Sequence, residues 1–210
     1  MYEENIEVAK DFHKFLHMNW RLPLWLGVIV EKLPTEMWIY QELLYDIRPT
    51  KIIETGSGYG GSALFFASIL DLLGQGQVIS IDVKEIERPK HPRIKYIIGN
   101  SVSEEVFREV RKMIKEEDVV LVSLDSDHYW EHVLSELELY SQLVTVGSYV
   151  VVEDTNEYAR VPILKNGEKE AGPEKAVEEF LKKHQNFIVD RSREKFYISC
   201  CLKGYLRRIF

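Results

Sequence analysis

Acidic side chains stand at the ends of two apolar runs in this 210-residue chain, and they are the first candidates for chemistry. Asp125 and Asp127 follow the run VVLVSL, and Glu153 with Asp154 follows SYVVV. If both runs are parallel strands, their carboxyl ends meet at the edge of the sheet where such folds place ligands. Carboxylates gathered there repel one another unless protons or a cation intervene, and Mg²⁺ accepts coordination by oxygen alone. The pattern predicts a divalent-metal site, with scattered surface acids as the alternative.

Two histidines stand beside the first acid pair. His128 and His132 are four residues apart, so on a helix they share one face, which is the spacing of a metal-binding pair. With Asp125 or Asp127 they would form a two-histidine, one-carboxylate iron site. That arrangement leaves the later Glu-Asp pair without a role. We therefore favour the oxygen-only metal site and expect His132 to be an ordinary helix residue.

A glycine-rich run, IETGSGYGGS, leaves a predicted strand and opens a predicted helix, where missing side chains let a ligand approach the backbone closely. With Gly61 as its third glycine, the run fits the dinucleotide pattern G-x-G-x-x-G. With Gly60 instead, and Glu54 two residues before the first glycine, it fits the E-x-G-x-G-x-G pattern of S-adenosylmethionine (AdoMet) enzymes. A plain structural turn is the remaining alternative. The candidate cofactor-binding residues of this loop are Glu54, Gly56, Ser57, Gly58, Gly60 and Ser62.

Asp82 ends the next β-rich run, QVISID. A carboxylate at this strand end accepts two hydrogen bonds at once, which suits the hydroxyl groups of a ribose. Both cofactor interpretations of the glycine run use such an acid. The alternative is that Asp82 only caps a loop.

The elements that must position these residues alternate between strands and helices. The β-rich runs are KIIE, QVISID, RIKYIIG, DVVLVSLD and SYVVVED. Helices are predicted over 59–73, 102–115 and 129–143, and a late helix begins at Gly172-Pro173. The second of these opens at Ser101-Val-Ser-Glu104, which has capping-box spacing. Strand–helix alternation predicts an α/β, doubly wound, mostly parallel sheet, in the order expected of a Rossmann-like class I methyltransferase.

The two ends of the chain depart from this alternation. We expect helices over about 3–18 and from an N-cap at Thr35 to before Pro49, so residues 1–50 form a helical extension to a domain at 51–210. The closing runs NFIVD and KFYISCCL predict a terminal hairpin with one antiparallel strand, placing Cys200 and Cys201 in a buried strand. The polar segment 155–172 is a candidate lid over the site.

Composition narrows the class of protein. The chain is 45% apolar, which excludes intrinsic disorder, and its net charge of −7 argues against a nucleic-acid partner. The acidic start MYEENIEVAKDF lacks the features of a secretion signal, and the apolar stretches are shorter than a membrane span. We therefore expect a cytoplasmic protein with no membrane partner.

Five stretches together resemble the cephalosporin hydroxylase-like methyltransferases, and the combination spans most of residues 24–181. They are LWLGVIVEKLPTEMWIYQELLYDIRP, KIIETGSGYGGSALFFASIL, LDSDHYWEHVLSELELYSQLV, GSYVVVEDT and AGPEKAVEEFL. Members of this family are AdoMet-dependent O-methyltransferases with a magnesium site. They are related to macrolide-sugar and rhamnosyl O-methyltransferases, which place an acid-x-x-His on one strand end and a Glu-Asp pair on the next.

The resemblance implies a role for each of the residues that match this pattern. Asp125, Glu153 and Asp154 would be the metal ligands, and His128 would be the general base. AdoMet would lie over the glycine loop and close to Asp125. Its ribose would lie on Asp82 and its adenine near Gly99, Asn100 and Ser101.

The sequence therefore predicts a metal-dependent O-methyltransferase that uses AdoMet and Mg²⁺ or Mn²⁺. Its acceptor would be a hydroxyl of a small molecule, a sugar or an antibiotic-like compound. We also expect a homo-oligomer. The alternatives are a nicotinamide-dependent oxidoreductase, which gives the acidic cluster no task, a metal-dependent hydroxylase, and a non-catalytic nucleotide or AdoMet binder.

Overall fold

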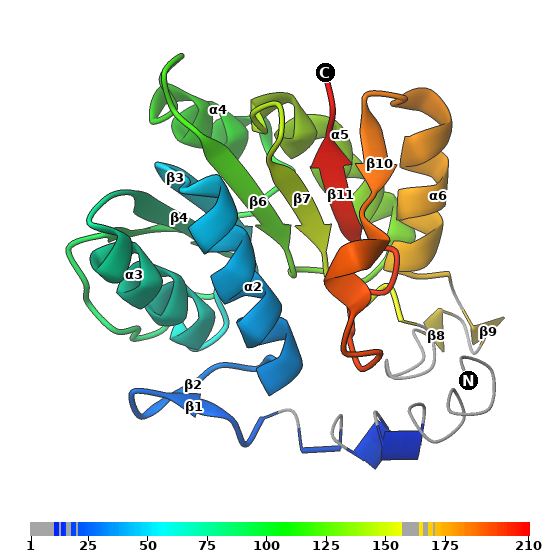
Figure 1. Ribbon diagram of the computed structural model, residues 1–210, viewed down its shortest axis with the longest axis horizontal. Helices are drawn as coiled ribbons and strands as arrows, with labels where there is room; N and C mark the ends of the chain where they lie inside the picture. Colours follow the sequence, from blue (N-terminus) through cyan, green and yellow to red (C-terminus); the bar gives the residue numbers. More distant parts are fainter. Residues whose placement is uncertain are drawn as a thin grey trace.

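A seven-stranded sheet forms the centre of the molecule in the computed structural model, which describes residues 11–12, 14–15, 18–19, 21–156, 164–165, 168–169 and 171–210. The strand order is β10-β11-β7-β6-β3-β4-β5. The strands are β3 (Lys51–Thr55), β4 (Gln77–Asp82), β5 (Ile94–Ile98), β6 (Val120–Leu124), β7 (Tyr149–Val152), β10 (Phe187–Val189) and β11 (Tyr205–Arg208). Only β11 runs against its neighbours in this sheet, and its arrow points the opposite way to those of β6 and β7 (Figure 1).

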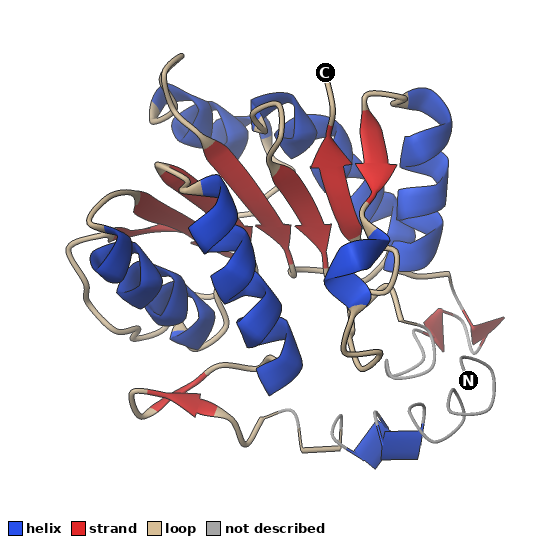
Figure 2. Cartoon of the chain, in the orientation of Figure 1, coloured by secondary structure: helices blue, strands red, loops and turns tan. Residues whose placement is uncertain are grey.

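Helices cover both faces of the sheet (Figure 2). Helices α2 (Pro34–Ile47) and α3 (Gly61–Leu73) pack on one face. Helices α4 (Glu104–Lys112), α5 (Trp130–Tyr140) and α6 (Pro173–Lys183) pack on the other. Because the chain leaves β3 toward β4 on one side and reaches β6 on the other, the strand order reverses at β3. This reversal opens a crevice at the carboxyl ends of the strands.

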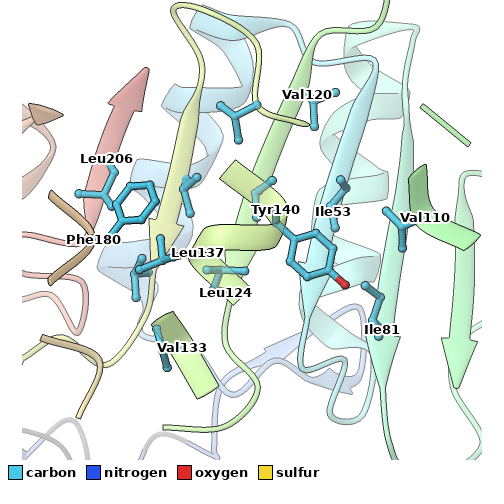
Figure 3. Packing of buried hydrophobic residues seen from close by; sticks show 14 of the residues in the cluster. Ile53, Ile81, Val110, Val120, Leu124, Val133, Leu137, Tyr140, Phe180 and Leu206 are labelled. Atoms are coloured by element: carbon cyan, nitrogen blue, oxygen red, sulfur yellow. The ribbon is translucent and has the colours of Figure 1, made fainter. Parts of the chain in front are cut away.

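The two faces are built by alternation within each strand. Ile52 packs with α2 and α3, whereas the next residue, Ile53, packs with α4 and α5, because successive side chains of a strand point to opposite faces. Figure 3 shows Tyr140 and Leu137 of α5 directed at this second face. The Tyr140 hydroxyl donates to the Ser101 carbonyl oxygen at 2.7 Å, so its polar end is satisfied inside the core.

The predicted sheet, its parallel strands and its helices are confirmed, but several helix starts differ. Helix α2 begins at Pro34 with Leu33 as its N-cap, so Thr35 is not the cap. Helix α4 is capped by Ser103, whose hydroxyl accepts from the Val106 amide, because a turn closed by the Ser103 amide on the Asn100 carbonyl oxygen precedes the helix. Helix α3 begins at Gly61, two residues after the predicted start, because the preceding residues form the tight turn of the glycine loop.

The last strand is not the one that the sequence predicted. The run KFYISCCL follows a 3-10 helix (Arg191–Glu194) and consists of turns, and β11 begins only at Tyr205. Cys200 and Cys201 are buried as expected, but they lie in a turn and not in a strand. The Cys200 amide donates to the Glu36 carboxylate, and its carbonyl oxygen accepts from the Asn156 amide. These tertiary hydrogen bonds replace the strand ladder that the apolar composition suggested.

The described residues from 21 to 50 pack against the sheet and α3. The predicted helix over 3–18 lies largely outside the described residues. The stretch LPLWLGVIV includes a short hairpin, β1 (Leu24–Trp25) and β2 (Val28–Ile29), and the Trp25 indole donates to the Ser68 hydroxyl of α3 at 3.1 Å. The division at residue 50 stays a prediction.

The candidate lid over 155–172 lies for the most part outside the described residues. Of that segment, β8 (Leu164–Lys165) and β9 (Glu168–Lys169) pair in antiparallel fashion. Among the described residues, no helix has both the length and the apolar character needed to cross a bilayer.

Candidate active site

A cavity of about 640 Å³ lies at the carboxyl ends of the parallel strands, next to the chain that leaves the β1–β2 hairpin. Most of the predicted site residues line it. They are Gly56, Ser57, Gly58, Ser62, Asp82, Asn100, Ser101, Asp125, His128, Glu153 and Asp154. Two predicted residues, Glu54 and Gly60, do not line it.

The glycine loop is pressed against neighbouring backbone. Gly56 has φ +85°, and a Cβ there would lie 1.8 Å from the Asp125 carbonyl oxygen, so only glycine lets the loops after β3 and β6 approach this closely. A Cβ on Gly58 would lie 2.5 Å from the Glu31 carboxylate, which covers the loop from the N-terminal segment. The loop therefore offers a backbone surface for a ligand, as predicted for a cofactor site.

Glu54 lies behind the glycine loop. It is fully buried, and the Ser80 hydroxyl donates to its carboxylate while the Ser57 and Ser80 hydroxyl oxygens are 2.6 Å apart. Burial raises the pKa of Glu54 to about 7, although the Lys32 ammonium opposes this shift. Gly60 packs behind the loop too, against the Tyr96 hydroxyl. Glu54 and Gly60 therefore support the glycine loop on the side away from the cavity.

Asp82 is held at the tip of β4 by the loop that it was expected to serve. Its Oδ2 accepts from the Gly58 amide at 2.9 Å, and its Oδ1 accepts from the Lys84 amide at 2.8 Å. The Arg88 guanidinium lies 3.3 Å from Oδ2 and donates to the Gly58 carbonyl oxygen. The carboxylate thus caps the loop and also faces the cavity. Because both of its oxygens already accept hydrogen bonds from the loop, the ribose contact stays a prediction.

A lysine that the sequence interpretation missed lies at the centre of the acidic cluster. The Lys32 ammonium is 2.8 Å from Asp125 Oδ2 and 2.7 Å from Glu153 Oε1, and its side chain is only 1% exposed. The Tyr40 hydroxyl also donates to Glu153 Oε1, at 2.6 Å. Burial raises the pKa of Asp125 and of Glu153, and the positive charge of Lys32 opposes this rise. Burial lowers the pKa of Lys32, but the charges of these two carboxylates hold it well above its usual value.

The remaining acid and the histidine meet on the cavity side of this cluster. His128 Nδ1 lies 3.0 Å from Asp154 Oδ2, and His128 Nε2 lies 3.9 Å from Asp125 Oδ1. One ligand atom from each of the three residues lies within 4.8 Å of the others. Asp154 has φ +54°, a strained conformation for a residue with a side chain, which is found most often at functional positions.

This donor set fits a hard divalent cation. Two of the three carboxylates, those of Asp125 and Glu153, contact the Lys32 ammonium, and the third, that of Asp154, lies beside His128 and Asp125, so negative charge is in excess among these described residues. Oxygen donors of this kind suit Mg²⁺ or Mn²⁺. Asp127 stands apart: it is exposed, and its carboxylate accepts from the Tyr129 amide in the turn before α5.

Glu36 adds a further acid below the cluster. It is buried, and its carboxylate accepts from the Leu33 and Cys200 amides. Burial and the charge of Glu153 raise the pKa of Glu36 to about 8. Lys32, Tyr40 and Glu36 all come from the segment around the start of α2. Their only signal in the sequence is that polar residues interrupt an otherwise apolar stretch.

His132 belongs to a different network at the other end of the cavity. Its Nε2 lies 3.2 Å from the hydroxyl oxygens of Ser101 and Ser126 and 3.5 Å from Glu136 Oε1. Both serine hydroxyls donate to the buried Glu136, and the hydrogen bond to Glu136 raises the pKa of His132. His132 is therefore not an ordinary helix residue, and it is turned away from the acids, which disfavours the two-histidine iron site.

Comparison with known proteins identifies the family. Residues 18–209 match the family described as Rhamnosyl O-methyltransferase/CmcI. The chain belongs to this family. A rhamnosyl O-methyltransferase of Mycobacterium leprae is 33% identical over 217 residues, which cover 99% of this chain and 93% of that protein. A second, from Mycobacterium tuberculosis, is 31% identical and covers 99% of this chain and 87% of the relative.

Solved structures of Rhamnosyl O-methyltransferase/CmcI-like proteins share the fold. "cmcI-D160 Mg-SAM" matches with a TM-score of 0.67 and 21% identity over 90% of this chain and 78% of that one. MycE from the mycinamycin pathway, in complex with Mg and SAH, matches with a TM-score of 0.56 and 18% identity over 81% of this chain and 48% of that one. The predicted class I methyltransferase fold is confirmed, and family membership makes the chain an AdoMet-dependent O-methyltransferase.

Proposed function

We propose that this enzyme methylates a hydroxyl group of a sugar, with a rhamnosyl unit as the first candidate. AdoMet is the methyl donor, and a divalent cation, Mg²⁺, is the second cofactor. One observation carries the proposal: a single cavity has the glycine loop and Asp82 at one end and the cluster of Asp125, His128 and Asp154 at the other. A methyl donor and an acidic metal site therefore share one space.

The metal would be held by Asp125, Glu153 and Asp154. A divalent cation there supplies positive charge that lowers the pKa of a nearby hydroxyl group. His128 is the general base of this proposal. Its Nδ1 lies 3.0 Å from Asp154 Oδ2, a pairing that would orient the ring and leave the Nε2 lone pair to accept the proton of the acceptor hydroxyl.

The rest of the reaction is a matter of placing two partners. Asp82 and the glycine loop would hold the nucleoside part of AdoMet, which would supply the methyl group and leave as S-adenosylhomocysteine. Nε2 of His128 would take the proton of the acceptor hydroxyl, so that its oxygen could form the new bond to the methyl carbon as the carbon–sulfur bond breaks. Orienting two reactants in this way is worth up to about 7–11 kcal/mol of barrier.

The sugar acceptor rests on the two mycobacterial relatives, which are rhamnosyl O-methyltransferases and align with nearly the whole chain. Sugars also suit a polar, acidic site, because their neighbouring hydroxyl groups offer several oxygen atoms to one cation. The cavity wall is mixed in character, with charged groups at the acidic end and serine hydroxyls at the other. We therefore propose a glycoside in preference to an apolar alcohol.

A panel of acceptors tests this assignment. The enzyme, AdoMet and Mg²⁺ would be incubated with phenyl rhamnoside, phenyl glucoside and catechol, and the products followed by mass spectrometry. The proposal predicts a singly methylated rhamnoside, made far faster than a methylated glucoside. Methyl transfer to catechol with none to either glycoside would overturn the sugar assignment. The His128→Ala variant serves as the blank.

A further inference from the structure

Lys32 is the one buried cation among the described residues of the acidic cluster, and its position is fixed by the backbone around it. It follows β2 and precedes the N-cap of α2. The Val30 amide donates to the Pro23 carbonyl oxygen at 3.1 Å, and Gly61 lies so close that a Cβ there would be 2.1 Å from the Ile29 carbonyl oxygen. The junction of hairpin and helix therefore aims Lys32 into the site.

The contacts of Lys32 divide the cluster into two parts. Its ammonium donates hydrogen bonds to Glu153 Oε1 and Asp125 Oδ2, both at less than 3 Å. The other oxygen of Asp125, Oδ1, lies on the side of His128 and Asp154. Asp125 thus has one oxygen on the buried lysine and one toward the cavity. Glu153 is anchored at Oε1 by Lys32 and Tyr40 together.

The net charge of this cluster matches the charge of one divalent cation. Three ionised carboxylates and one ammonium leave a net charge of −2, which one divalent cation neutralises. Without Lys32 the same acids would carry −3, close together, with Glu153 buried and the other two partly buried. Carboxylates in that state repel strongly and favour protonation over a fixed geometry.

We propose that Lys32 is a positioning residue: a tethered cation that keeps Glu153 and Asp125 in place when no metal is bound and matches the cluster to a single divalent ion. The inference rests on the proposed metal-dependent function. It goes beyond that function because it assigns a role to a residue outside the acids and the base. It also explains how Glu153 and Asp125 stay assembled between metal-binding events.

Thermal unfolding in the presence of EDTA tests the positioning role without any metal. Lys32→Met should lower the melting temperature by on the order of 10 °C, because it leaves Glu153 and Asp125 without a cation, and Glu153→Gln should lower it less, because Lys32 keeps its contact with Asp125. The double variant Lys32→Met/Glu153→Gln should lose less than the sum of the two single losses. The surface pair Lys182 and Glu179, also 2.7 Å apart, is the matched control and should show almost no loss.

Additive losses in this cycle, or an unchanged melting temperature for Lys32→Met, would overturn the positioning role. If Lys32→Met does not fold, Lys32→Arg keeps the charge, and the double variant is compared directly with the wild type. In that case the double variant must still be folded, although it melts below the wild type because Asp125 has lost its cation. A double variant that also fails to fold while Lys32→Arg is stable would count against the pairing.

Calorimetric titration with Mg²⁺ tests the charge match. Glu153→Gln leaves a net charge of −1 and should bind Mg²⁺ weakly, whereas the double variant returns the cluster to −2. We expect the double variant to bind Mg²⁺ at least about tenfold more tightly than Glu153→Gln. Equal affinities would contradict the inference. If the wild type itself binds no Mg²⁺, the proposed metal-dependent function fails, while the EDTA cycle still decides the role of Lys32.

Discussion

Two buried glutamates mark the two ends of the cavity, and their partners differ in charge. At the metal end, Glu153 is held by the Lys32 ammonium and the Tyr40 hydroxyl. At the other end, Glu136 is held by the hydroxyl groups of Ser101 and Ser126, beside His132. Both glutamates are at most 5% exposed. Burial alone therefore does not set their role, and the partner that each acquires does.

The difference suits two kinds of ligand. The metal end keeps excess negative charge beside the cavity. This charge favours a cation, and it also favours the hydrogen atoms of hydroxyl groups near that cation. At the opposite end, the buried Glu136 carboxylate accepts from serine hydroxyl groups and lies beside the His132 imidazole. This end therefore presents polar groups with little net charge. Such a surface suits the uncharged rings of a nucleoside, and Asp82 adds one carboxylate there for the predicted ribose contact. One cavity thus separates a reaction end with several acids from a binding end with mostly uncharged polar groups.

The largest expected effect comes from the metal end. Asp154→Ala should abolish Mg²⁺ binding and reduce methyl transfer by on the order of 10³-fold, because the charge supplied by the metal is worth several kcal/mol. Asp127→Asn, which alters an exposed acid one turn away, is the matched control and should keep both properties. Calorimetry with Mg²⁺ and an AdoMet turnover assay measure the two. Retained Mg²⁺ affinity in Asp154→Ala would remove it from the metal site.

His128 tests whether the metal end also holds the base. His128→Ala should keep Mg²⁺ and AdoMet binding while turnover falls by about 10²–10⁴-fold, because the general base is lost. His91, which lies 3.1 Å from Asp71 on the surface, offers a histidine–aspartate pair of similar length as a control. If His128→Ala instead loses Mg²⁺ at saturating cofactor, the histidine is a metal ligand and the iron-type alternative gains support.

At the nucleoside end, Asp82 is the residue to change. Asp82→Ala removes charge-assisted hydrogen bonds worth about 1.5–3 kcal/mol, so S-adenosylhomocysteine should bind roughly 10–100-fold more weakly. Mg²⁺ binding should be unaffected, which separates the two ends. Asp71→Ala, a change at an exposed acid, is the control. An unchanged dissociation constant for Asp82→Ala would move the ribose contact elsewhere.

The last effect concerns the stability of the fold and not the reaction, and it comes from Glu54, which lies behind the glycine loop. Its pKa is raised by burial from 4.5 to about 7, so the folded state holds the proton more tightly than the unfolded state. The resulting stability is fully present below pH 4.5 and is lost as the pH rises through about 7, a change on the order of 2–3 kcal/mol.

Denaturant unfolding between pH 4.5 and 8 would measure this change. Glu54→Gln should flatten the dependence, and the exposed Glu105→Gln should leave it as in the wild type. An identical pH dependence in Glu54→Gln and the wild type would show that Glu54 does not titrate in this range.

Local patterns in the sequence were sufficient for much of the fold and of the site. Alternating strands and helices predict the parallel sheet, because each apolar run is long enough for one strand and is followed by a helical period. Asp82, Asp125 and Asp154 are found at strand ends for the same reason: an acid that interrupts an apolar run marks where the strand leaves the core. Their roles as ligands of AdoMet or metal stay predictions.

What the sequence did not predict depends on contacts between distant parts of the chain. Lys32 bonds to residues 93 and 121 positions away, and no local spacing signals that. The last strand was misplaced because KFYISCCL is as apolar as a strand, but its backbone bonds to α2 and to the loop after β7. Tyr205 and its neighbours pair with β7 instead. Burial and strand pairing are separate properties, and composition reports only the first.

Metal dependence is the most direct test of the central claim that one cavity joins a metal end to a nucleoside end. Methyl transfer to a rhamnoside would be measured after EDTA treatment and again after Mg²⁺ is returned in excess. We predict that transfer is lost in EDTA and restored by Mg²⁺, while S-adenosylhomocysteine binds in both conditions. Full methyl transfer in EDTA would contradict the account, because the acids and Lys32 would then serve no metal.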